Sequence, residues 1–89
     1  MANAIVLAGR VRRDATELRG LTACVVEDNG GVPFAVMTAD ESLRSALRSL
    51  VSGDMAIFSG HMTYGSGGEM IVLISSVEKL EREGGSNNE

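Results

Sequence analysis

The chain has 89 residues, of which 44% are hydrophobic, and a formal net charge of −4 at pH 7. This length predicts a single domain with a small core. No strictly apolar run is longer than that of residues 70–74, which is far shorter than the roughly 20 residues of a membrane span. The start of the chain lacks the basic region of a secretory signal. A single cysteine, Cys24, excludes an internal disulfide and favours a reducing compartment, the cytoplasm.

The first predicted strand covers residues 4–13, AIVLAGRVRR. Its alternation predicts that one set of side chains faces the core and the other faces solvent. Arginine avoids full burial unless it is paired, so the core set is Ile5, Leu7, Gly9 and Val11. Residues 14–20 lack strand periodicity and end in glycine, which predicts a short loop.

Basic side chains gather near this loop, at Arg10, Arg12, Arg13 and Arg19. On a mildly acidic body they form a local basic stripe, which suits contact with phosphate groups. The alternative is a solvated edge in which the arginines pair with Asp14, Glu17 and Glu27.

Residues 21–38, LTACVVEDNGGVPFAVMT, hold two apolar runs on either side of residues 27–31. Val, Thr, Phe and Cys suit a half-buried sheet. Asn-Gly and Gly-Gly supply the positive φ angles of a tight turn. The pattern predicts a β-hairpin that forms the second and third strands.

An amphipathic helix is predicted next, with a capping box from Thr38 to Glu41 and an end at Ser52-Gly53. Over three turns, apolar residues recur at helical spacing, namely Leu43, Ala46, Leu47, Leu50 and Val51. Arg44 and Arg48 lie one turn apart on the polar side.

Two more strands are predicted over residues 54–64 and 69–77, joined by a glycine-rich turn. The element order is therefore β-β-β-α-β-β. Residues 80–89 have little to bury and predict a flexible acidic tail. The predicted domain covers residues 1–79.

Three short motifs follow one another along the chain: Ile5-x-Leu7-x-Gly9-x-Val11 with Arg19-Gly20, Val26-Glu27-Asp28-x-Gly30-Gly31, and Gly53-Asp54-x-Ala56-x-Phe58-x-Gly60. With these motifs the chain resembles nucleic-acid-binding OB-fold domains, including bacterial single-stranded DNA-binding and primosomal proteins and the anticodon-binding domains of class II aminoacyl-tRNA synthetases. The resemblance implies an all-β, five-stranded OB-fold barrel with one helix between strands three and four. An SH3-like barrel is the alternative, but it leaves the helix unexplained.

In that family, nucleic acid lies across strands two and three. The resemblance places Ala23, Val25, Glu27, Phe34 and Val36 on the outer face, and Cys24, Val26, Ala35 and Met37 inside the barrel. It also implies that aromatic side chains stack on bases and that arginines contact phosphates. The predicted nucleic-acid-binding residues are Arg10, Arg12, Arg13, Arg19, Val25, Phe34 and Tyr64. The alternatives are that Phe34 packs under a loop or a partner and that Tyr64 is an ordinary strand-end tyrosine with its hydroxyl in water.

Nothing in the sequence predicts catalysis, a metal or a cofactor. His61 is the only histidine and lacks the further ligands that a metal site needs. Cys24 reads as a small buried hydrophobe. Gly65 to Gly68 lacks the lysine and the following helix of a phosphate-binding loop. We therefore expect a protein that is not an enzyme.

The run from Met70 to Ile74 is apolar on both faces, whereas a strand of a small barrel needs only one apolar face. Contiguous outward apolar residues mark an interface. We expect a homodimer or a higher homo-oligomer built on strands four and five, or on strand one. Its predicted interface is Met55, Ile57, Met70, Val72 and Ile74. Alternatively, the N-terminal residues or the tail cover part of this run.

The first functional hypothesis is non-catalytic binding of single-stranded nucleic acid, DNA ahead of RNA, across strands two and three. The alternative is an OB-fold protein–protein interaction module or assembly subunit with little or no nucleic-acid affinity. The net charge of −4 and the absence of tryptophan favour the alternative. The basic stripe and the predicted position of Phe34 favour the first.

Overall fold

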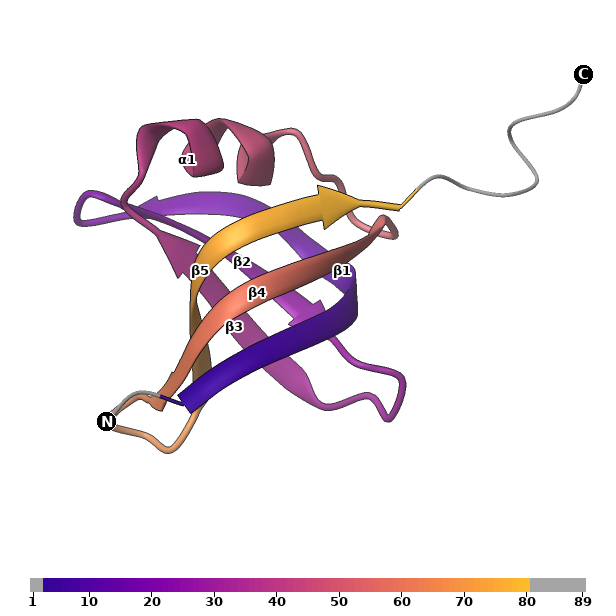
Figure 1. Cartoon of the computed structure of the whole chain (residues 1–89), viewed down its shortest axis with the longest axis vertical. Helices are drawn as coiled ribbons and strands as arrows, with labels where there is room; N and C mark the ends of the chain where they lie inside the picture. The colour runs from indigo at the N-terminus through magenta and orange to yellow at the C-terminus, as the bar shows by residue number, and fades with distance from the viewer. Residues whose placement is uncertain (1–2, 81–89) are drawn as a thin grey trace, which may run out of the picture.

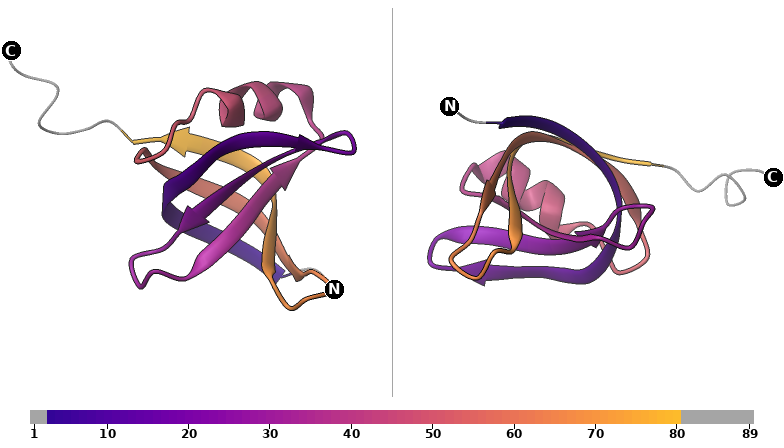
Figure 2. Two further views of the ribbon diagram at one scale, coloured as in Figure 1. Left: turned by 180° about the vertical axis from the view of Figure 1, so that it is seen from behind. Right: turned by 90° about the horizontal axis from the view of Figure 1, so that it is seen from below.

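The computed structural model describes residues 3–80, which form a five-stranded closed barrel with one helix. The elements are β1 (Asn3–Leu18), β2 (Leu21–Glu27), β3 (Pro33–Thr38), α1 (Glu41–Arg48), β4 (Met55–Tyr64) and β5 (Met70–Lys79). Their order around the barrel is β1-β2-β3-β5-β4, and β1 closes it by pairing with both β2 and β4. Of the five strand pairs, only β3 with β5 is parallel. This architecture confirms the predicted OB-fold (Figures 1 and 2).

The core fills the barrel, and α1 covers one end of it (Figure 1). The predicted inner face of β1 is confirmed, because Leu7 and Val11 are buried while Val6 is 73% exposed. The buried cluster is Leu7, Val11, Cys24, Val26, Phe34, Val36, Leu47, Leu50, Ala56, Phe58, Val72 and Ile74. The β2–β3 and β4–β5 turns lie at the end opposite α1, and the β1–β2 turn lies near α1 (Figure 1).

The first strand is longer than predicted, and the predicted loop over residues 14–20 is wrong. β1 continues to Leu18, and only Arg19 and Gly20 form the turn, with φ angles of 49° and 84°. Two register irregularities in β1, between Val11 and Arg13 and between Arg13 and Thr16, interrupt the alternation while the pairing with β2 continues. Bulges of this kind hide a strand from a simple period-two pattern.

The helix is shorter than predicted. Its N-cap is Asp40, whose carboxylate accepts from the N–H groups of Ser42 and Leu43, so the capping box starting at Thr38 is wrong. Thr38 Oγ1 instead accepts from the Asp40 N–H at 3.0 Å. The helix ends at Arg48, before the predicted Ser52-Gly53. A separate turn follows, in which Asp54 Oδ2 accepts from the Val51 N–H at 2.9 Å.

The predicted facing of β3 is wrong. Phe34 and Val36 point into the core, at 8% and 0% exposure, and Ala35 and Met37 face outward. The cause is the register of the hairpin, in which Phe34 pairs with the buried Val26. Directly paired residues share a face of the sheet.

The facing of β5 also differs from the prediction. Val72 and Ile74 are buried in the core, at 0% and 7% exposure, and are not part of an outer interface. They pair with Met62 and Gly60, which lie on the side of β4 that faces the interior. Leu73, at 47% exposure, faces outward instead.

β5 ends at Lys79, and the Leu80 N–H donates to the Met55 carbonyl at 2.8 Å. The rest of the predicted tail, residues 81–89, lies outside the described residues. Residues 3–80 contain no helix of the length and hydropathy needed to cross a membrane.

Candidate functional site

The outer face of β2 and β3 carries small and apolar side chains in two rows across the strands. In one row Val25 lies between Arg13 of β1 and Ala35 of β3. In the next, Ala23 lies between Thr16 and Met37. These side chains form an apolar floor, with the exposed Arg13 at its β1 edge. Sequence reasoning placed Val25 on this face correctly but assigned Ala35 and Met37 to the interior.

A hollow of about 320 Å³ lies where this floor meets the β4–β5 turn. Its lining is mostly apolar, namely Val25, Pro33, Phe34, Ala35, Gly68, Glu69 and Met70. Because Phe34 is only 8% exposed, its ring contributes to the wall of the hollow and presents no open face to a base. The prediction that Phe34 lies exposed as a platform is therefore wrong. Met70, predicted for an oligomer interface, belongs to this hollow and packs against the core.

Tyr64 stands beside the hollow. It pairs directly with Met70 across the β4–β5 hairpin, and such pairs place their side chains on the same face. Tyr64 is 61% exposed, so its ring is open to solvent next to Met70, which lines the hollow. An accessible aromatic ring beside an apolar floor suits stacking with a planar group.

The four predicted arginines are all exposed, but they do not form one continuous stripe. Arg13 lies beside the floor and makes no ion pair with any residue in the range 3–80. Arg19 lies in the β1–β2 turn, at the end of the barrel near α1 (Figure 1). Arg10 and Arg12 lie at the other end of β2. Arg10 is paired with Glu27 across the two strands, and Arg12 lies near Glu27.

The predicted pairing of these arginines with nearby acids holds for one pair. Arg12 Nε lies 3.5 Å from Glu27 Oε2. Glu17 instead accepts from Arg44 and Arg48 of α1, which places those two arginines at the helix-covered end of the barrel.

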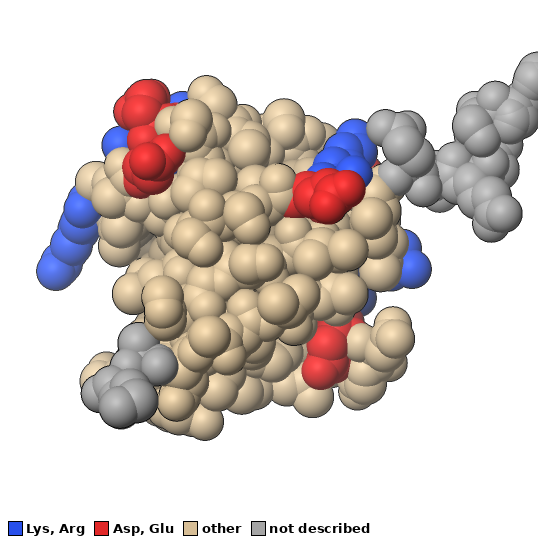
Figure 3. All heavy atoms as spheres, in the orientation of Figure 1, with Lys and Arg blue, Asp and Glu red and all other residues tan. Residues whose placement is uncertain are grey.

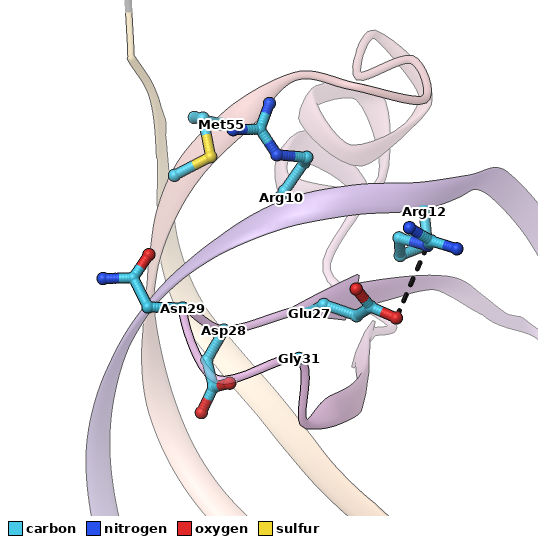
Figure 4. A pocket seen from close by; sticks show the side chains of 7 residues that line it. All are labelled: Arg10, Arg12, Glu27, Asp28, Asn29, Gly31 and Met55. Atoms are coloured by element: carbon cyan, nitrogen blue, oxygen red, sulfur yellow. Dashed lines mark ion pairs between the residues drawn. The ribbon is translucent and has the colours of Figure 1, made fainter.

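A second pocket, of about 300 Å³, lies between β1 and the β2–β3 turn (Figure 4). It is lined by Arg10, Arg12, Glu27, Asp28, Asn29, Gly31 and Met55. Arg10 Nη1 donates to the Gly53 carbonyl at 3.1 Å. Asp28 Oδ1 accepts from the N–H groups of Gly30 and Val32, each at 2.9 Å, and so holds the turn. Met55, predicted for an oligomer interface, forms one side of this pocket.

The remaining outer face, over the first half of β1, β4 and β5, is almost free of charge, and Lys, Arg, Asp and Glu lie around its rim (Figure 3). The registers place Val6 beside Ser59 and Leu73 beside His61 on this face. Val6 and Leu73 are 73% and 47% exposed. Ile57, one of the predicted interface residues, lies on the same face and is partly exposed.

Cys24 is buried as predicted, at 2% exposure, and its thiol donates to the Arg13 carbonyl at 3.2 Å. Burial, with a smaller contribution from the nearby Asp14 charge, raises the pKa of this thiol to about 11. Within residues 3–80, no three His, Cys, Asp or Glu side chains gather closely enough to hold a metal ion.

No protein-family model matches the sequence, and no curated protein matches it significantly. Solved structures do resemble the fold. The second single-stranded DNA-binding protein of Mycobacterium smegmatis has a TM-score of 0.77 and 18% identity, covering 89% of both chains. The small single-stranded DNA-binding protein of Streptomyces coelicolor has a TM-score of 0.75 and 14% identity, covering 89% of this chain and 93% of that one. A chain of the Schizosaccharomyces pombe Stn1–Ten1 complex has a TM-score of 0.80 and 19% identity, covering 91% of this chain and 60% of that one. At these identities the likeness establishes the fold.

Proposed function

We propose that this chain binds single-stranded nucleic acid, DNA in preference to RNA, on the outer face of β2 and β3, without catalysing a reaction. One observation carries the proposal: an apolar floor around Val25 has the exposed Arg13 at one edge and the exposed Tyr64 beside the hollow at its end. Two of the similar structures described above are single-stranded DNA-binding proteins, which supports DNA as the ligand.

The floor suits a chain of unpaired bases because each base has an apolar face. One base stacks on Tyr64, and its neighbours lie over Val25, Ala35 and Met37. Arg13 and Arg19 neutralise phosphates along the β1 side. Phe34 supports the hollow from below and does not stack. The body is acidic overall, so we expect modest affinity that weakens with salt.

The test is fluorescence anisotropy of a labelled ~30-nucleotide oligo-dT, titrated with the protein at low and at physiological salt. A matched ~30-nucleotide oligo-rU reports the preference between DNA and RNA. Tyr64→Ala is expected to cost about 1–3 kcal/mol, the usual value of one stacked base, whereas Tyr64→Phe keeps the affinity. Arg13→Gln should make the fall of log K for DNA binding with log salt less steep by about 0.7, whereas Arg13→Lys should keep the slope unchanged.

A flat titration at low salt by a folded protein would refute this proposal. The alternative function, a protein-interaction module, would then stand, and the net charge of −4 already favours it. The likeness to a chain of the Stn1–Ten1 complex, an assembly of two proteins, points the same way.

We also infer that the chain forms a homodimer or a higher homo-oligomer through the nearly uncharged face of β1, β4 and β5. Exposed apolar side chains on a face with few charges favour association, and Val6 is the most exposed large one described. Sedimentation velocity should show an oligomer that Val6→Glu dissociates. Val51→Glu is the matched control, because Val51 is also exposed, at 53%, but lies in the turn after α1. A monomeric parent protein at tens of micromolar would overturn the inference.

A further inference from the structure

The pocket between β1 and the β2–β3 turn adjoins the proposed nucleic-acid face. Glu27 follows Val25 on the same side of β2, two residues closer to the turn. Side chains on one face of a strand recur every two residues, about 7 Å apart. A strand of nucleic acid that crosses Val25 toward the turn therefore reaches this pocket with its next nucleotides.

The charges of the pocket argue against a simple phosphate site. Two guanidinium groups, Arg10 and Arg12, face two carboxylates, Glu27 and Asp28, so the formal charges cancel. Phosphate would meet repulsion from both carboxylates. A neutral group that both donates and accepts hydrogen bonds fits better. The volume of about 300 Å³ is at the lower end of ligand pockets, which suits a group the size of one nucleoside.

The hydrogen-bonding groups of the pocket differ in how far their donors and acceptors are already used within the protein. Asp28 Oδ1 already accepts from the Gly30 and Val32 N–H groups and holds the turn. Arg10 uses one N–H on the Gly53 carbonyl, which positions its guanidinium and leaves other N–H groups available.

Glu27 is the carboxylate that a ligand can engage. Its pair with Arg12 is long, at 3.5 Å, and both side chains are partly exposed, at 32% and 56%. Surface pairs of this kind contribute little to stability, so a ligand can replace this one at small cost. Figure 4 shows Arg10 and Met55 on one side of the opening and Glu27 on the other.

We propose that this pocket binds a guanine base of the bound strand. The Glu27 carboxylate accepts from the adjacent N1–H and N2–H₂ groups of guanine, and Arg10 donates to its O6 and N7 acceptors. The Met55 thioether contacts the face of the ring. Thymine offers a single N–H on its edge, so it satisfies the carboxylate less well. This inference rests on the proposed function and deepens it, because it gives the strand a preferred register.

The test compares four labelled strands of about 8 nucleotides, short enough to leave few alternative registers on one OB-fold, by anisotropy: all-dT, and dT strands carrying a single central dG, dC or deoxyinosine. One bidentate contact implies that the dG strand binds about fivefold or more tightly than all-dT. The deoxyinosine strand, which lacks the N2 amino group, should lose most of this gain. The dC strand should gain less than the dG strand.

Glu27→Gln should lower the dG-to-dT affinity ratio, with the Arg10 contact retained, while all-dT binds more tightly because a negative charge beside the strand is removed. Glu41→Gln is the matched control, because it removes one exposed carboxylate at the start of α1, at the other end of the barrel (Figure 1), and it should leave the ratio unchanged.

Equal binding of the all-dT and dG strands would overturn the guanine site and leave the proposed function standing. A ratio that Glu27→Gln does not change would also overturn it. Absence of binding by every strand at low salt would overturn both the site and the proposed function.

Discussion

Glu17 of β1 and Arg44 of α1 are joined directly: Arg44 Nη2 donates to Glu17 Oε1 at 2.8 Å. Arg48 Nε donates to the other carboxylate oxygen at 3.0 Å, and the fully buried Thr22 donates to it through Oγ1 at 3.0 Å. The helix is thereby tied to the end of the β1–β2 hairpin. The hydrogen bonds from Arg44, Arg48 and Thr22 lower the pKa of Glu17 from 4.5 to about 2.

This pKa shift predicts a loss of stability in acid. A carboxyl whose pKa is lower in the folded state stabilises the fold above its unfolded value, and this contribution is lost as pH falls from about 4.5 toward 2. Glu17→Gln should therefore lower the urea midpoint at pH 7 and flatten its dependence on pH between about 5 and 2. The hydrogen bonds from Ser42 and Leu43 also lower the pKa of Asp40, so the variant keeps part of its acid sensitivity. Parallel curves for parent and variant would contradict this assignment.

The β1–β2 turn predicts a substitution with opposite effects on stability and binding. Arg19 has a φ of 49°, in the left-handed region that costs an ordinary residue about 1–2 kcal/mol and that asparagine tolerates better. Arg19→Asn should stabilise the fold by about 0.5–1 kcal/mol, raising Tm by several degrees. If Arg19 contacts a phosphate, the same variant lowers the salt slope of DNA binding by about 0.7. An unchanged or lower Tm would refute the turn argument.

The inertness of Cys24 is a further prediction. Its thiol is buried and its pKa is raised to about 11, so very little thiolate exists at neutral pH and none of it is accessible without opening of the barrel. A disulfide reagent such as DTNB should label the native protein very slowly and the urea-unfolded protein at once. Rapid labelling in native buffer would show that the β1–β2 region opens locally.

The sequence correctly predicted those features whose local residue pattern is compatible with a single kind of structure. The alternation of Leu7 and Val11 with exposed residues defines the inner face of β1, and the Asn-Gly segment locates the β2–β3 turn. The helix was predicted because its apolar spacing belongs to no strand. Its boundaries were wrong because both Thr38 and Asp40 can cap a helix, and the choice depends on tertiary geometry.

The facing of β3 and β5 could not be read from periodicity, because both strands are apolar on both sides. For β3 the register decides: Val26 pairs with Phe34, so the ring enters the core. For β5 the deciding contacts are non-local, with β4 and with the parallel strand β3. The candidate site depends on these same two strands, which explains why Phe34 was expected to be exposed and Met70 was assigned to another surface.

Gly60 supplies the most direct test of the β4–β5 register. It pairs with Ile74 next to an irregularity at Ser59, and there the strands approach so closely that a Cβ on Gly60 would collide with the Leu73 carbonyl and lie 2.7 Å from the Ile74 Cα. Backbone atoms cannot give way as a flexible side chain does, so Gly60→Ala should cost about 3 kcal/mol or more of unfolding free energy. Gly30→Ala is the matched control, because the added methyl group would meet only Asp28 Oδ1, at 3.5 Å. Its urea midpoint should stay near that of the parent. Equal midpoints for both variants would mean that the two strands are not so closely apposed in solution.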